Sequence, residues 1–144
     1  MRILLADDHE EFLGEFAALL AGRHEIVGSA RDGEELLRLA SSCRPDLILA
    51  DINMPRMNGM AAVRKIIEQA GPSETAPPKA IFVTTHSSPQ YIRHALDIGA
   101  SGFVHKFYAF EQIEEAIEAM LAGRVYLSPQ LNFPASPAAR PEAR

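Results

Sequence analysis

Short apolar runs alternate with helical patterns along most of the chain. The runs are brief and largely uninterrupted by polar residues, which is typical of strands buried on both faces of a parallel sheet. They cover Ile3–Ala6, Ile26–Ala30, Leu47–Ala50, Ala80–Thr84 and Gly102–His105. Between them, apolar residues recur at the three- and four-residue spacing of an amphipathic helix. The order predicts an α/β fold in which a strand–helix unit is repeated five times, with right-handed crossovers and helices on both faces of the sheet.

Residues that favour helix ends agree with this division. Asp32 and Glu35 have the spacing of a capping box, Asn58 can cap the third helix, and Ser88 precedes a first-turn proline in the fourth. Glycines follow the helical patterns at positions where a left-handed residue is favoured. These are Gly22, Gly71, Gly99 and Gly123.

Composition places the chain among single globular domains. It has 144 residues, of which 47% are hydrophobic and 23% are charged. The single cysteine, Cys43, allows no disulfide within the chain, and no apolar run is long enough to cross a bilayer. We therefore expect a cytoplasmic protein without a membrane segment. The formal net charge of −5 argues against direct nucleic-acid binding by this segment, because phosphate neutralisation drives such affinity.

The end of the chain differs in composition from the rest. Four of the ten prolines lie after residue 128, among alanines. Such a composition is typical of an unpacked linker. We therefore divide the chain into a folded domain over residues 1–125 and a flexible Pro/Ala-rich linker or tail over residues 126–144, and we expect mobility from about Ser128 onward.

The polar residues that follow the predicted strands indicate a binding site. Asp7 and Asp8 follow the first strand, and Asp51 follows the third. Thr84 ends the fourth strand and Lys106 follows the fifth. Ligands of an open parallel sheet bind beyond the carboxyl ends of the strands. If the first and third strands are neighbours, three carboxylates converge there, and their repulsion requires either protons or a hard cation such as Mg²⁺.

The same edge of the sheet carries groups that can hold a phosphoryl group. The Lys106 ammonium and the Thr84 hydroxyl can bind phosphoryl oxygens. A carboxylate nucleophile, a metal and a cationic clamp together predict phosphoryl transfer to an aspartate. Taken singly, each residue has an ordinary explanation, such as a solvated turn for the paired aspartates or a core position for Phe103. Their joint placement favours the functional interpretation.

Four segments together carry a family resemblance. They are Ala6–His9, Asp51–Gly59, Val83–Thr84 and Gly102–Lys106. They resemble the receiver domain of two-component response regulators, the CheY-like superfamily, and the similarity covers about residues 1–125. The resemblance implies a flavodoxin-like, doubly wound, five-stranded parallel sheet with the strand order 2-1-3-4-5.

The resemblance also implies a role for each residue of the acidic site. Asp51 would accept a phosphoryl group from a phosphohistidine on a sensor histidine kinase. Asp8 and Asp51 would ligate Mg²⁺, or alternatively Mn²⁺, through their side chains. Asn53 would add its backbone carbonyl, and Asp7 would act mainly through a metal-bound water. The domain would catalyse only its own phosphorylation and dephosphorylation, so it would not be an enzyme for external substrates.

The remaining matched positions imply a switch. Lys106 would pair with the phosphoryl oxygens, and Thr84 would hydrogen-bond the phosphate. Phe103 would change rotamer as Thr84 moves toward it, which would alter the surface around the fourth helix, fifth strand and fifth helix. The sequence departs from the family pattern at Phe107, where a proline or a polar residue is frequent, and in having phenylalanine rather than tyrosine at position 103.

Other classes of function fit less well. An aspartate-nucleophile phosphatase of the haloacid dehalogenase type needs a second aspartate two residues after the nucleophile, where this chain has Asn53. A nucleotide-binding protein would have a Walker-type phosphate loop or a GxGxxG turn after the first strand. The five histidines lack a zinc-ligand spacing. An interaction module that works without phosphate is disfavoured by the intact acceptor, metal and lysine positions.

The output of the domain has two interpretations. Ala122–Pro129, together with Ala6–His9, resembles receivers of the NarL/FixJ (LuxR) type, in which a linker leads to a helix-turn-helix DNA-binding domain. The chain is then either the receiver part of such a transcriptional regulator or a stand-alone receiver that acts through protein contacts. The sequence identifies neither the kinase nor whether phosphorylation produces a homodimer.

Overall fold

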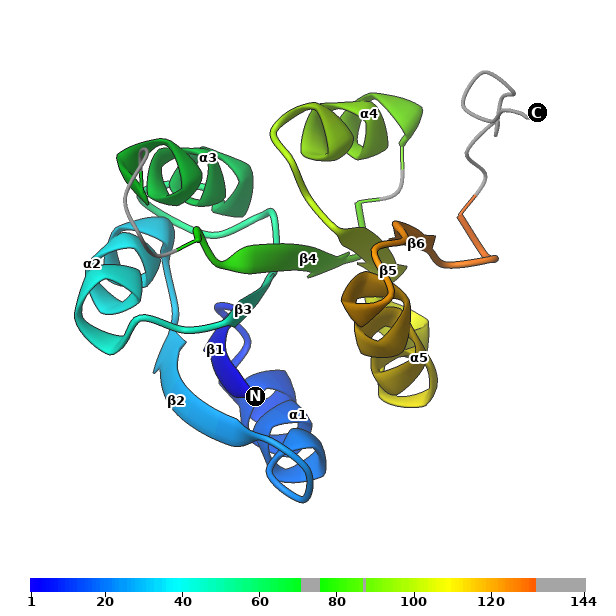
Figure 1. Ribbon diagram of the computed structural model, residues 1–144, viewed down its shortest axis with the longest axis horizontal. Helices are drawn as coiled ribbons and strands as arrows, with labels where there is room; N and C mark the ends of the chain where they lie inside the picture. The colour runs from blue at the N-terminus through cyan, green and yellow to red at the C-terminus, as the bar shows by residue number, and fades with distance from the viewer. Residues whose placement is uncertain (71–75, 87, 132–144) are drawn as a thin grey trace.

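The computed structural model describes residues 1–70, 76–86 and 88–131. They form a parallel sheet flanked by helices (Figure 1). The strands are β1 (Arg2–Ala6), β2 (Glu25–Ala30), β3 (Leu47–Ala50), β4 (Lys79–Thr84), β5 (Gly102–His105) and β6 (Tyr126–Leu127). The helices are α1 (Glu10–Leu20), α2 (Gly33–Cys43), α3 (Gly59–Ala70), α4 (Pro89–Asp97) and α5 (Ala109–Leu121), with a short 3₁₀ helix η1 (Lys106–Tyr108) before α5.

The predicted fold class is confirmed. The strand order is β2-β1-β3-β4-β5-β6, which contains the expected order 2-1-3-4-5, and every pairing is parallel. β3 and β5 have the expected bounds, and the other three expected strands begin one residue earlier than the apolar runs. The additional strand β6 lies at the β5 edge of the sheet.

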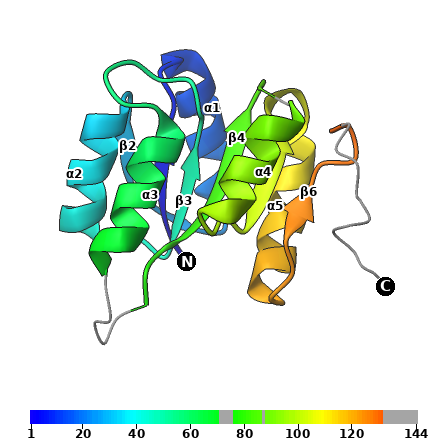
Figure 2. The same cartoon turned by 90° about the horizontal axis from the view of Figure 1, so that it is seen from above.

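Both faces of the sheet are covered, which explains the uninterrupted apolar runs. Helices α1 and α5 lie on one face and α2, α3 and α4 on the other (Figure 1, Figure 2). Ile3 and Leu5 join the apolar cluster under α1 and α5, whereas Leu4 and Ala6 join the cluster under the other three helices. An inner strand therefore needs an apolar residue at every position. Among the described residues, no helix is both long and apolar enough to cross a membrane.

The predicted helix caps are present in two of three cases. Asp32 Oδ1 accepts the backbone N–H of Glu35 at 2.8 Å, and Glu35 Oε1 in turn accepts the N–H of Arg31 at 2.9 Å. Glu35 therefore accepts the N–H of the residue before the cap rather than that of the cap residue itself. Asn58 Oδ1 accepts a backbone N–H in the first turn of α3 at 2.8 Å. Ser88 lies at the cap position of α4, but its side chain makes no capping hydrogen bond, so this prediction was right only in position.

Of the predicted left-handed glycines after helix ends, two have that conformation and one does not. Gly99 (φ 101°) and Gly123 (φ 80°) adopt the left-handed conformation that was expected. Gly22 does not, because the chain leaves α1 through a right-handed cap residue with φ −64° and ψ −16°. Helix α2 instead ends at a left-handed Arg44 (φ 50°), which the sequence pattern did not indicate. Gly71 lies outside the described residues.

The boundary that was expected at residue 125 is too early. Tyr126 and Leu127 pair with Gly102 and Phe103 of β5. Beyond them, Ser128 (2% exposed) and Leu131 (7% exposed) are buried. A two-residue strand is too short to produce a recognisable apolar pattern, and the nearby prolines suggested a linker instead. Residues 126–131 therefore belong to the folded domain, and the rest of the expected tail, residues 132–144, lies outside the described residues.

Candidate functional site

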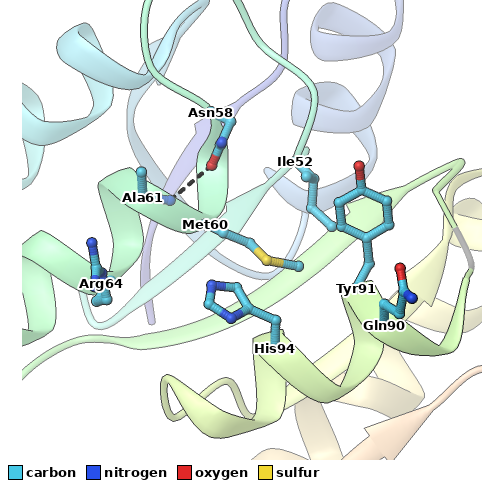
Figure 3. Close-up of a pocket in the computed structure, with 8 residues that line it drawn as sticks. All are labelled: Ile52, Asn58, Met60, Ala61, Arg64, Gln90, Tyr91 and His94. Atoms are coloured by element: carbon cyan, nitrogen blue, oxygen red, sulfur yellow. Dashed lines mark hydrogen bonds between the residues drawn. The ribbon is translucent and has the colours of Figure 1, made fainter.

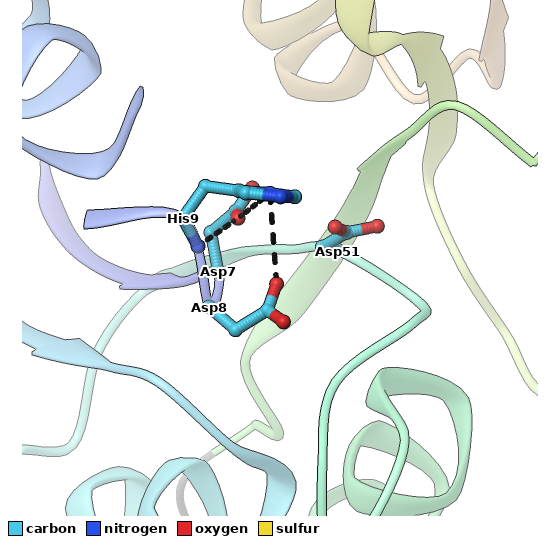
Figure 4. A group of neighbouring side chains, drawn as sticks. All are labelled: Asp7, Asp8, His9 and Asp51. Carbon is cyan, nitrogen blue, oxygen red and sulfur yellow. Dashed lines mark hydrogen bonds and ion pairs between the residues drawn. The ribbon is translucent and has the colours of Figure 1, made fainter. Parts of the chain in front are cut away.

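The carboxyl ends of β1 and β3 bring the predicted acidic residues together. These two strands are neighbours, so Asp7 and Asp8 leave the sheet beside Asp51. One ligand atom from each of Asp7, Asp8, His9 and Asp51 lies within 4.8 Å of the others (Figure 4). The three carboxylates therefore converge as the sequence predicted, and we call these four residues the acidic cluster.

Asp51 uses one carboxylate oxygen to hold its own loop and presents the other to the site. The residue is buried, with 5% of its surface exposed. Its Oδ1 accepts the backbone N–H of Ile52 at 2.7 Å and that of Asn53 at 3.4 Å. Its Oδ2 lies 3.4 Å from the Nζ of Lys106. Because the loop occupies Oδ1, Oδ2 is the oxygen that faces a ligand or a reactant.

Lys106 follows β5 and reaches into the acidic cluster. Its Nζ lies 2.7 Å from Asp7 Oδ2, 3.4 Å from Asp51 Oδ2 and 3.1 Å from His9 Nδ1. The ring of Phe12, in the first turn of α1, lies against the same ammonium, with its centroid 4.7 Å away. Charge attraction and the cation–π contact both hold the lysine between the two buried carboxylates.

The carboxyl group of Asp7 is the most perturbed acid of the cluster. Burial raises its pKa above the ordinary value of 3.8, and the negative charge of Asp51 acts in the same direction. Lys106 and the backbone N–H of His9, which donates to Asp7 Oδ1 at 2.8 Å, lower the pKa but do not cancel the effect of burial. The ionised form of Asp7 is therefore held in the fold at a cost.

The donor atoms fit a hard divalent cation. Asp7 Oδ2 is buried beside the Lys106 ammonium, which lies 2.7 Å away. A buried carboxylate oxygen in this state is stabilised by a nearby cation. Asp8 is 36% exposed at its side chain, which leaves the cluster open to water. Oxygen ligands with access to water suit Mg²⁺, whereas His9 offers a nitrogen that Mg²⁺ seldom takes.

Thr84 is the last residue of β4 and Phe103 is the second residue of β5, and both are fully buried. Thr84 Oγ1 accepts the backbone N–H of His86 at 3.1 Å, which holds the turn that leaves β4. The ring of Phe103 packs against that of Phe82, with 6.4 Å between the centroids. Phe103 is therefore part of the core in this structure and does not face solvent.

The loop between β3 and α3 returns closely to the backbone of the acceptor. Gly59 N donates to the carbonyl of Ile52 at 2.8 Å. A Cβ at position 59 would lie 1.9 Å from the carbonyl oxygen of Asp51, so only glycine fits. The start of α3 therefore lies directly against the backbone of the acceptor. Asn53 lies exposed in the same loop, two residues after Asp51.

A hollow of about 450 Å³ lies between α3 and α4, beside this loop (Figure 3). It is lined by Ile52, Asn58, Met60, Ala61, Arg64, Gln90, Tyr91 and His94. The ring of Tyr91 lies 5.2 Å from that of His86, the residue whose N–H holds Thr84. The wall of the hollow is thus connected to the turn that leaves β4.

Two contacts of the site were not predicted from the sequence. His9 Nδ1 lies 3.1 Å from the Nζ of Lys106 and 3.3 Å from Asp7 Oδ1. Its position directly after the paired aspartates was the available signal. Nothing in the sequence indicates the contact between the Phe12 ring and Lys106.

Residues 3–118 match the family described as response regulator receiver domain. This chain belongs to that family. Receiver domains are parts of two-component signalling regulators; they take phosphoryl groups from histidine kinases and bind Mg²⁺ at an acidic pocket. In this chain the acidic cluster lies at the carboxyl ends of β1 and β3.

Relatives of the receiver domain are regulators of transcription. The transcriptional regulatory protein DegU of Brevibacillus brevis is 32% identical over 133 residues, which are 91% of this chain and 54% of DegU. The response regulator GacA of Pseudomonas aeruginosa is 30% identical over 133 residues, 91% of this chain and 60% of GacA. The chain thus spans little more than half the length of these relatives.

Solved structures agree in fold and subfamily. A two-component response regulator of the LuxR family from Aurantimonas sp. SI85-9A1 has a TM-score of 0.81 and 32% identity, covering 90% of this chain and 91% of that chain. The signal receiver domain of NarL from Mycobacterium tuberculosis has a TM-score of 0.76 and 29% identity, covering 85% and 97%. The predicted likeness to NarL- and LuxR-type receivers is confirmed.

Proposed function

We propose that the domain catalyses transfer of a phosphoryl group from a phosphohistidine to Asp51, with Mg²⁺ bound at the acidic cluster. The orientation of Asp51 is the observation that supports this most directly. Its Oδ1 is held by two backbone N–H groups, and its Oδ2 lies 3.4 Å from the Lys106 ammonium. A carboxylate oxygen that is fixed beside a cation suits in-line attack on phosphorus.

In the transfer, Asp51 Oδ2 forms a bond to phosphorus while the bond between phosphorus and the donor imidazole breaks. The imidazole nitrogen keeps the electron pair of that bond and takes up a proton from solvent. Lys106 holds the phosphoryl oxygens, whose negative charge it offsets. Its contacts with Asp7 and Asp51 place its ammonium at the acceptor before the donor arrives.

Four residues would hold the metal. Asp8 and Asp51 would ligate Mg²⁺, or Mn²⁺, through their side chains, Asn53 would contribute its backbone carbonyl, and Asp7 would act mainly through a bound water. When bound, the ion neutralises charge between the acceptor and the incoming phosphoryl group. The convergence of three carboxylates, of which Asp7 and Asp51 are buried, supports this assignment.

Thr84 and Phe103 would relay the modification to the surface. The Thr84 hydroxyl would donate to the phosphate, and its movement would change the packing of Phe103 beneath α4. The burial of both side chains supports this role, because a shift of one buried group forces its neighbours to repack. The surface of α4, β5 and α5 would then be the part that changes.

The output is proposed to be control of transcription, as the names of DegU and the other relatives suggest. We expect no direct DNA contact from this acidic segment itself, since its formal net charge is −5. The alternative is a stand-alone receiver that acts through protein contacts, including a homodimer.

The test is incubation with Mg²⁺ and acetyl phosphate, followed by intact mass measurement of the wild type and an Asp51→Asn variant. We expect the wild type to gain one phosphoryl group that is stable in acid and labile in base, and the variant to gain none. Omission of Mg²⁺ should abolish the gain. An unmodified wild type that is folded and binds Mg²⁺ would reject the proposal in favour of a receiver scaffold that works without phosphate.

A further inference from the structure

The residues that follow α5 form an edge strand and then turn back over the sheet. Ser128 N donates to the carbonyl of Phe103 at 3.1 Å, so pairing with β5 continues past β6. Leu131 N donates to the carbonyl of Ser128 at 3.0 Å, and the Leu131 side chain is buried in the same apolar cluster as Phe103. We call residues 126–131 the C-terminal strap.

The hydroxyl of Ser128 is buried and makes two hydrogen bonds. It accepts the backbone N–H of His105 at 3.0 Å and donates to the side-chain oxygen of Gln112 in α5. The amide nitrogen of Gln112 donates to Gln130 Oε1 at 2.8 Å, so Gln112 holds the strap at two points. An apolar side chain at position 128 would leave the His105 N–H and the Gln112 oxygen without these partners.

The hydrogen bond from His105 acts directly beside the lysine of the site. His105 precedes Lys106, and its ring Nδ1 accepts the backbone N–H of Phe107 on the other side, at 3.1 Å. The backbone is therefore fixed by Ser128 before Lys106 and by the His105 ring after it. The Lys106 ammonium lies 2.7 Å from Asp7 at the end of a long side chain, so a small change in backbone direction displaces it from the acceptor.

We infer that Ser128 is a positioning residue for Lys106, and that the C-terminal strap is therefore a functional part of the phosphoacceptor site. The inference rests on the proposed function, in which Lys106 holds the phosphoryl oxygens. The backbone N–H of Ser128 also donates to the carbonyl of Phe103, which connects the strap to β5. A change in β5 upon phosphorylation reaches the strap, and by reciprocity the strap influences phosphorylation.

The test compares Ser128→Ala and Ser128→Thr with the wild-type chain of residues 1–144. Ile66→Val is the control for a general loss of stability, because Ile66 lies near Met1 and Lys79 at the opposite end of the sheet. The initial rate of phosphorylation is measured at saturating Mg²⁺ over a range of acetyl phosphate concentrations. The dissociation constant for Mg²⁺ is measured separately by calorimetry.

We expect Ser128→Ala to lower the maximal rate by about tenfold while the Mg²⁺ dissociation constant stays the same, because the carboxylates are not moved. Ser128→Thr keeps the hydroxyl and should restore most of the rate, and Ile66→Val should match the wild type. A wild-type rate in Ser128→Ala, or an equal loss in Ile66→Val, would overturn the inference while the proposed function stands. A wild type that is never phosphorylated would overturn both.

Hydrogen exchange on the wild type provides a measurement that does not depend on the folding of a variant. Addition of Mg²⁺ and beryllofluoride, a phosphomimetic, should change the protection of the Ser128 and Leu131 amides, which donate to Phe103 and Ser128. Exposed amides at the far end of α2 serve as the reference. Unchanged protection in the strap would contradict the coupling and with it the inference.

Discussion

At the scale of single residues, the site holds more negative charge than its lysine offsets. Asp7, Asp8 and Asp51 converge near one ammonium group, that of Lys106. Burial raises the pKa of Asp7, so the folded state binds its proton more tightly than the unfolded chain does. Stability due to this group therefore falls as the pH rises above its ordinary value of 3.8. A cation bound between these carboxylates would favour their ionised forms and so oppose this loss of stability.

Replacement of Asp7 by asparagine should separate stability from metal binding. In the presence of a chelator at neutral pH, we expect Asp7→Asn to unfold at a higher temperature than the wild type, since it removes a buried charge. The difference should shrink as the pH falls toward 3.8. Affinity for Mg²⁺ should fall by about tenfold or more, as is typical when an outer-shell partner is lost.

Thermal unfolding and calorimetric titration of the variant provide the two measurements. Glu118→Gln removes an exposed carboxylate from α5 and is the matched control, which should change neither quantity. A lower unfolding temperature for Asp7→Asn in chelator would contradict the conclusion that the buried charge of Asp7 lowers stability.

At the scale of elements, the loop that carries the acceptor is held by close backbone contacts. A Cβ at position 33, the first residue of α2, would lie 2.0 Å from the carbonyl oxygen of Met57, and one at position 59 would lie 1.9 Å from that of Asp51. The loop between β3 and α3 therefore packs closely against the first residue of α2 and the first residue of α3. Arg56 in this loop adopts a positive φ of 67°, which adds local strain.

Two glycines offer a matched pair of substitutions. Gly59→Ala should lower the free energy of unfolding by about 3 kcal/mol or more, because backbone has to move to admit the methyl group. Gly14→Ala should raise it by about 0.5–1 kcal/mol, because position 14 is inside α1 and has open space around it. Urea denaturation measures both, and a Gly59→Ala variant as stable as the wild type would contradict the close approach.

The cap of α2 should show a pH dependence of the opposite sign. The backbone N–H of Glu35, with help from Arg56, lowers the pKa of Asp32 below 3.8. A lowered folded-state pKa gives stability that is present above 3.8 and is lost as the pH falls through the folded value. Asp32→Ala should therefore cost about 1 kcal/mol at neutral pH, and less in acid.

Denaturation curves at neutral pH and at about pH 3 measure this difference. Asp32→Asn is the control, since it keeps the capping oxygen and removes only the charge. A cost of Asp32→Ala that is independent of pH would show that the charge contributes nothing to the cap.

At the scale of the whole molecule, the described chain ends in contact with the switch residues. Leu127 and Leu131 pack in the cluster that contains Phe103, and β6 closes the β5 edge of the sheet. The folded unit is therefore longer than the stretch that matches the receiver-domain family, residues 3–118.

Shortening the chain measures what this segment contributes. A chain of residues 1–125 should lose about 3 kcal/mol of unfolding free energy, because the burial of Leu131 and the hydrogen bonds of Ser128 are lost. A chain of residues 1–131 should keep the stability of the full chain, as the proposed linker would require. Equal stability of the 1–125 chain, measured by urea denaturation, would place the domain boundary back at residue 125.

The local pattern of apolar and polar residues was sufficient to predict the strands and helices and to select the acidic residues of the site. Strands with helices on both sides leave uninterrupted apolar runs, so the expected strands agree with the observed ones to within one residue. Asp7, Asp8 and Asp51 could be chosen because strand ends of a parallel sheet meet at one edge, and the strand order then brought them together. These features depend on residues that are close in the sequence or on a rule of topology.

Contacts between distant segments were decided only by the tertiary structure. The bond from His105 to Ser128 joins residues 23 positions apart, and the contact from Lys106 to His9 joins residues 97 apart. No sequence pattern identifies either pair, because serine, histidine and lysine are also common on exposed surfaces. Their partners are chosen by how the sheet and its helices pack, which no local window of the chain contains.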